Sequence, residues 1–105
     1  MTGVTVVRNQ VLERRPQAVA QFLADHAASV RSVLANPAGA SQMVVELGIA
    51  DNAALVERAI PRCNLVCLVG PEMKQAVAGY LQVLHGQNPA SVGGGLPPST
   101  FYLVS

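Results

Sequence analysis

Histidine and cysteine are the residues of this chain with the greatest potential for chemistry, and there are two of each. Cys63 and Cys67 are four residues apart, which in an extended segment separates their Cα atoms by roughly 13 Å. A disulfide tolerates at most about 7 Å, and two cysteines without a second pair nearby do not make a zinc site. We therefore expect buried free thiols, because cysteine is among the residue types most often found in protein cores.

The two histidines do not indicate a metal or catalytic site. His26 lies on the apolar stripe of a predicted long helix, and its neighbour Asp25 points about 100° away around that helix. We interpret His26 as a core histidine with one hydrogen bond. His85 falls at the end of another predicted helix, where a partial positive charge suits the helix dipole.

No other pattern predicts catalysis or cofactor binding. Gly93-Gly94-Gly95 leads into Pro97-Pro98 and not into a helix, so these glycines predict an irregular connector over residues 93–99 and not a phosphate loop. The serines lack a G-x-S-x-G setting, and the six acidic residues are dispersed. We expect a protein that is not an enzyme, with no catalytic residue, no metal and no cofactor, and we assign no ligand-binding residue.

Composition points to a partner surface. The 105 residues suffice for one domain with a modest core, but half of them are hydrophobic and only 12% are charged. Excess apolar residues on so small a chain tend to be exposed, which usually marks a binding surface. The seven basic residues are scattered and aromatics make up 4%, which argues against nucleic acid as a partner.

Targeting signals are not evident either. No apolar stretch approaches the roughly 20 residues of a transmembrane helix, so we expect no membrane span. The first residues also lack the charged start and long apolar run of a signal peptide.

Two apolar runs predict strands. Residues 4–7 (Val-Thr-Val-Val) and 65–69 (Leu-Val-Cys-Leu-Val) are apolar on both faces, as in a sheet that helices cover on each side. A weaker third run lies near residues 100–103. A covered sheet normally needs more strands than these, so we expect one part of a larger α/β domain.

The rest of the chain predicts helices with recognisable ends. A short turn over residues 9–14 precedes a long helix over residues 16–35, whose apolar residues recur at three- and four-residue steps. Asn36-Pro37 caps the next helix, which Gly48 ends, and Asp51 is predicted to cap a third. Gly70-Pro71-Glu72 opens a fourth, which we expect to close at Gly86.

The order of these features resembles one family. The matching features follow one another along nearly the whole chain: residues 4–9, Leu12-Glu13-Arg14-Arg15-Pro16, Val19, Phe22-Leu23, His26-Ala27, Asn36-Pro37, Ala59-Ile60-Pro61-Arg62-Cys63-Asn64, Gly70-Pro71-Glu72-Met73-Lys74, Tyr80-Leu81 and Asn88-Pro89. Each is moderately specific. Together they resemble the C-terminal part of an ABC-transporter substrate-binding protein of the nitrate/sulfonate/taurine and thiamine-precursor type.

The resemblance implies an α/β fold that is predominantly helical, a partial lobe of a type 2 periplasmic-binding-protein fold with one or two strands and about four helices. Residues 1–105 would then form a single partial domain, the C-terminal portion of lobe 1. Family members close two lobes on a small ligand, and most of that cleft falls outside this sequence. The implied function is that of a fragment of a solute-binding component for a small organic or anionic nutrient.

The resemblance also implies partners and a location. The partners would be the missing lobe of the same protein, or a second copy in a homodimer, and an ABC permease for the full-length family. A full-length member would be periplasmic or lipid-anchored outside the cytoplasm, whereas this chain expressed alone would be cytoplasmic. The alternative hypothesis, from a different class, is a free-standing helical module that forms homo-oligomers and has no small-molecule ligand.

Overall fold

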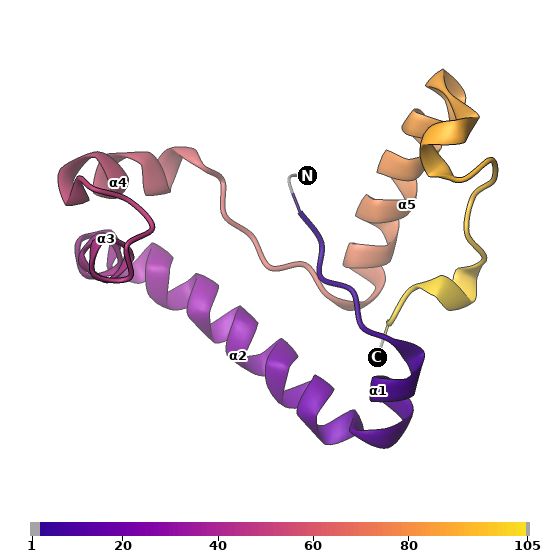
Figure 1. Ribbon diagram of the computed structural model, residues 1–105, viewed down its shortest axis with the longest axis horizontal. Coiled ribbons are helices and arrows are strands. Elements are labelled where there is room, and N and C mark those ends of the chain that lie inside the picture. The colour runs from indigo at the N-terminus through magenta and orange to yellow at the C-terminus, as the bar shows by residue number, and fades with distance from the viewer. Residues whose placement is uncertain (1–2, 105) are drawn as a thin grey trace. The chain divides into compact units, whose positions relative to one another are not determined.

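Helices make up 70% of the computed structural model, which describes residues 3–104 (Figure 1). No strand occurs among these residues, so the fold is all-α. Its α-helices are α1 (Asn9–Arg14), α2 (Pro16–Ala35), α3 (Pro37–Glu46), α4 (Ala53–Ala59) and α5 (Gly70–Gln87), and its 3₁₀ helices are η1 (Ile60–Arg62), η2 (Pro89–Val92) and η3 (Ser99–Phe101).

The predicted α/β fold is therefore wrong, and with it the one or two strands of a periplasmic-binding-protein lobe. Residues 4–7 and 65–69 have no regular structure, and the weak third run is interrupted by η3. Arg8, which follows the first run, and Val69, the last residue of the second, do have extended backbones. Strand propensity reflects how a side chain fits a half-buried sheet, and a strand also requires a neighbour that pairs with its backbone groups.

The helix boundaries follow local capping signals closely. The predicted bounds of α2 are confirmed, with Pro16 in its first turn. Asn36 caps α3 as predicted, because its side-chain oxygen accepts a hydrogen bond from the Gly39 N–H at 3.1 Å. The predicted cap of α4 is wrong by one residue: Asn52, and not Asp51, accepts from the Leu55 N–H at 3.3 Å. Asn and Asp are equally good N-cap residues. The sequence therefore did not show which of the neighbouring Asp51 and Asn52 caps α4.

Gly48 ends α3 with a positive φ of 76°, as the sequence predicts. The N–H of Ile49 donates to the carbonyl of Val44 at 3.1 Å, and the N–H of Gly48 donates to that of Val45 at 3.0 Å. This is a Schellman motif, which satisfies the last carbonyls of the helix. Glycine is needed here because an L side chain is strained at such a φ. The turn from α3 toward α4 is thereby fixed by local bonds.

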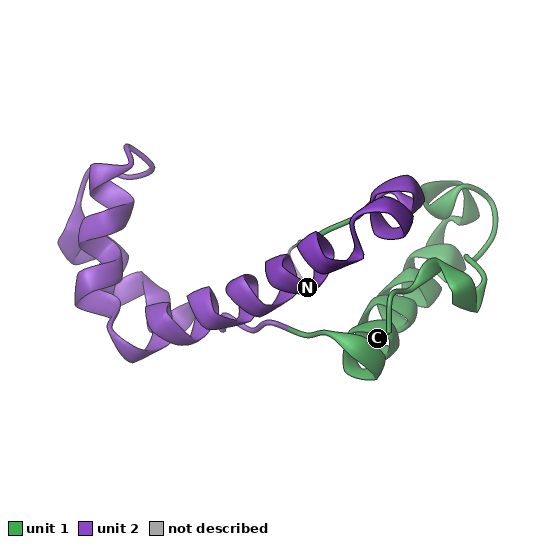
Figure 2. Cartoon of the chain, turned by 90° about the horizontal axis from the view of Figure 1, so that it is seen from below, with its two compact units in different colours: residues 1–6, 68–105 green, residues 7–67 purple. Residues whose placement is uncertain are grey.

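The chain divides into two units (Figure 2), which we describe separately. Unit 2 comprises residues 7–67, where α2 contacts α1, α3 and η1, and α3 packs on α4. Unit 1 comprises residues 3–6 and 68–104, where α5 packs on η2. The Ser91 hydroxyl of η2 supports that contact by donating to the Leu84 carbonyl of α5 at 3.3 Å.

Very little apolar surface is buried in either unit. Among the described residues the only buried hydrophobic side chains are Ala40 and Ile60, at 6% and 7% exposure. Large side chains such as Val6, Leu47 and Ile49 are exposed by 70% or more of their area (80%, 74% and 71%). The apolar stripes that define these helices in the sequence are therefore only partly covered within their own unit.

Replacing Asn52 with Ala should lower the free energy of unfolding by about 1 kcal/mol, because the N–H of Leu55 loses its acceptor at the start of the seven-residue α4. Urea unfolding followed by far-ultraviolet circular dichroism measures this. Asp51→Ala is the matched control, since Asp51 is exposed and lies outside the helix. An equal or larger loss for Asp51→Ala would contradict the assigned cap.

Candidate functional site

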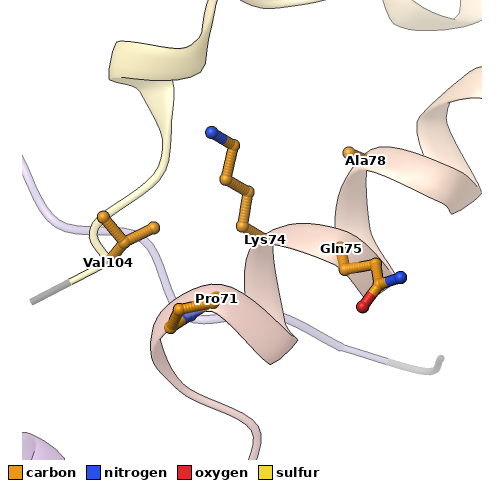
Figure 3. Close-up of a pocket in the computed structure, with 5 residues that line it drawn as sticks. All are labelled: Pro71, Lys74, Gln75, Ala78 and Val104. Atoms are coloured by element: carbon orange, nitrogen blue, oxygen red, sulfur yellow. The ribbon is translucent and has the colours of Figure 1, made fainter.

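A shallow groove lies in unit 1 between the first turns of α5 and the end of the chain. Figure 3 shows the five residues that line it, namely Pro71, Lys74, Gln75, Ala78 and Val104. A second hollow continues along α5, lined by Lys74, Gln75, Ala78, Gly79, Gln82, Leu96, Pro97, Ser99 and Tyr102. Both are therefore formed by one face of α5 and the segment that follows η2.

Gly70 allows the end of the chain to approach the start of α5. It has a φ of 64° and is buried, and a Cβ placed on it would lie 3.6 Å from the carbonyl oxygen of Val104. The positive φ is the stronger reason for glycine, because an ordinary Cβ contact fits at 3.6 Å but an L residue is strained in this conformation. Pro71 then enters the first turn of α5, where its missing N–H costs no hydrogen bond.

Lys74 is the charged residue of the groove. Its Nζ lies 5.9 Å from the centre of the Tyr102 ring, within the range of a cation–π interaction. The Phe101 and Tyr102 rings meet edge to face at 5.2 Å between centroids. In Figure 3 the Lys74 side chain extends toward the C-terminal segment, whereas Gln75 points the other way. These contacts hold the C-terminal segment against α5.

The groove does not form a catalytic constellation. Lys74 and Tyr102 are the titratable side chains that line it, and the lysine lies over the face of the aromatic ring. The remaining polar groups are the amides of Gln75 and Gln82 and the Ser99 hydroxyl. A general acid–base pair requires two titratable groups positioned on one reacting centre, and the lining offers no such arrangement. The groove is therefore best explained by local packing.

His26 is not a core residue, which corrects the interpretation from periodicity. It is exposed, and its ring stacks on that of Phe22 with centroids 5.8 Å apart and an angle of 23° between the rings. Phe22 is itself 48% exposed. The helical period places both rings on one side of α2, but periodicity alone does not provide the element that would cover them.

The cysteines are free, as predicted, but Cys63 is exposed and Cys67 only partly buried. The expectation that both are buried is wrong because residues 63–69 follow η1 as a largely exposed segment. His85 does lie in the last turn of α5, as predicted. Within residues 3–104 no three His, Cys, Asp or Glu side chains gather in a way that could hold a metal ion.

The glycines at residues 93 and 94 form a turn. Gly93 and Gly94 have positive φ values of 76° and 90°, and the N–H of Gly94 donates to the Pro89 carbonyl at 2.8 Å. These bonds terminate η2, in the same way that glycine terminates other helices. A phosphate loop would instead direct such N–H groups toward an anion at the start of a helix.

The exposed apolar surface is the more substantial candidate site. Large apolar side chains are exposed in each unit, among them Leu47 and Ile49 in unit 2 (74% and 71%) and Val83 and Phe101 in unit 1 (59% and 60%). The residues that form this exposed surface could be identified only from burial and not from composition.

Comparison with known proteins does not assign a function to this surface. No family model, curated protein or solved structure was found to match the chain. Within the described residues, no helix combines the length and apolar character needed to span a membrane.

Zinc should leave the melting temperature unchanged. In the described part of the chain, no cysteine or histidine belongs to a group of three potential metal ligands. Differential scanning fluorimetry with and without excess zinc is the measurement. A metal bound to the folded state at a hundred times its Kd would add about 2.7 kcal/mol. An increase of several degrees that disappears in Cys63→Ser would contradict this prediction.

Proposed function

We propose that this chain is the C-terminal part of the solute-binding component of an ABC transporter for a small organic or anionic nutrient. The proposal is supported by the succession of sequence features that resembles such proteins from residue 4 to Pro89. It requires no active site in the chain, and it takes the ligand contacts to be made mainly by the rest of the protein.

The observation that carries this proposal is the area left uncovered. Ala40 and Ile60 are the only hydrophobic residues buried in the described part of the chain, and large apolar side chains are exposed in both units. A chain that normally packs against the remainder of a larger protein would expose such an area when considered alone. The apolar side chains of α2, Phe22 and Leu34 among them, would then be covered by that remainder.

A solute-binding role also implies a setting for the complete protein. It would act outside the cytoplasm, in the periplasm or tethered by lipid, and would deliver its solute to an ABC permease. The chain itself would contribute helices that pack on the rest of the protein and would carry neither catalytic activity nor a cofactor.

The test is to supply the missing part as a second polypeptide and to measure association and solute binding. A one-to-one complex is expected, because burial of each large apolar side chain contributes roughly 1.5–3 kcal/mol before entropy costs. Size-exclusion chromatography detects the complex, and calorimetry with a panel of sulfonates and thiamine precursors detects the recovered binding.

Leu68→Asp should weaken that complex, because it replaces an exposed apolar side chain (41%), of the kind that the remainder would cover, with a carboxylate. Gln87→Asp, at an exposed polar position of α5, is the matched control and should not. If the chain and the missing part stay separate and no solute binds, the transporter proposal is wrong.

A second candidate function is a self-associating helical module without a small-molecule ligand. The same exposed apolar side chains favour it, since the interfaces of obligate homodimers are large and hydrophobic. The mixing experiment separates the two candidates. A stable homo-oligomer that ignores the added polypeptide favours this second candidate, whereas a hetero-complex favours the first.

A further inference from the structure

The segment that leads into α5 is exposed and has no regular structure. We call residues 65–69 the linking segment, and Figure 1 shows it as an uncoiled stretch between α4 and α5. Within it, Leu65, Val66, Leu68 and Val69 are exposed by 38%, 67%, 41% and 46%. No backbone hydrogen bond joins residues 66–68 to another described residue. The linking segment can therefore change its backbone conformation without breaking a helix.

These properties are those of a protease substrate. An endopeptidase binds its substrate as an extended strand, whose backbone groups pair with the enzyme. Helical residues cannot bind in this way until the helix opens, because their N–H and C=O groups are bonded within it. Residues 66–68 have these groups free, and Val69 already has an extended backbone, with φ −133° and ψ 167°. Leu65 and Leu68 supply the large side chain that an apolar specificity pocket takes just before the scissile bond.

We propose that the linking segment is a cleavage site for endopeptidases with an apolar specificity pocket, which cut after Leu65 or Leu68. The reaction is hydrolysis of one peptide bond. The leucine carbonyl carbon gains the hydroxyl of a water molecule, and the nitrogen of the next residue leaves as an amine with the remaining proton. The products are one piece that contains α1 to α4 and another that contains α5. Cleavage here requires neither candidate function.

Other irregular segments of the described chain suit such an enzyme less well. Residues 3–7 contain valines but no leucine or aromatic residue. Leu96 is exposed by 45%, but Pro97 follows it, and the proline ring on the leaving nitrogen hinders cleavage of that bond. The turn after α3 is held by hydrogen bonds from Gly48 and Ile49, and the C-terminal segment is attached to α5. The linking segment is thus the preferred site.

Limited digestion of the full chain with chymotrypsin, followed over time by mass spectrometry, identifies the first bond that is cut. We expect this cut after Leu65 or Leu68. The double variant Leu65→Ser/Leu68→Ser should be cut in this segment at least about tenfold more slowly, because neither position then fills the apolar pocket of the enzyme. Leu96→Ser is the matched control, since Leu96 is a comparably exposed leucine in an irregular segment, and it should leave the first cut unchanged.

Asn52→Ala distinguishes cleavage of the folded chain from cleavage after unfolding. Loss of the α4 cap raises the unfolded population, so cleavage that requires unfolding would become about fivefold faster. Cleavage of the linking segment in the folded chain should keep its wild-type rate. Circular dichroism checks that each variant keeps its helices. A first cut outside the linking segment, resistance of the wild type to the protease, or a fivefold acceleration by Asn52→Ala would overturn the proposal.

Discussion

The burial of apolar side chains is the constraint on which the rest of this structure depends. Isolated helices shorter than about 12–15 residues are marginal in water, and in proteins they are stabilised mainly by packing of an apolar face. α3 has ten residues and α4 has seven, yet of their apolar side chains only Ala40 is buried. Local capping holds the ends of these helices but contributes only about 1 kcal/mol at each site. Packing within the described residues therefore contributes little to the stability of these two helices.

That constraint links the two functional candidates. A piece of a solute-binding protein and a self-associating module would differ in ligand and location, but both require another polypeptide over the exposed helices. Leu47 and Ile49, the most exposed large side chains of unit 2, belong to the α3–α4 hairpin, which is already fixed by its own hydrogen bonds. A preformed surface binds with less loss of conformational freedom than a disordered one.

The groove of unit 1 supports the same view. Lys74 and Tyr102 come from distant parts of the sequence, and their contact, with Gly70 beneath the chain end, explains how the last residues attach to α5. The sequence did not predict the contact between Lys74 and Tyr102, because no regular spacing relates these two residues. Only the path of the chain through the η2 turn brings the two together. The interaction stabilises local structure and leaves no reactive group free in a closed cavity.

The sequence by itself determined the local elements. Pro16 and Asn36 mark the bounds of α2, and Gly48 ends α3, because capping and left-handed glycine depend only on neighbouring residues. Tertiary structure decided the fold class and burial. Residues 4–7 have strand-forming side chains but lack a pairing neighbour, and His26 has the periodicity of a core residue without an element to cover it. Pairing and burial depend on contacts between distant segments, which residue type and spacing do not specify.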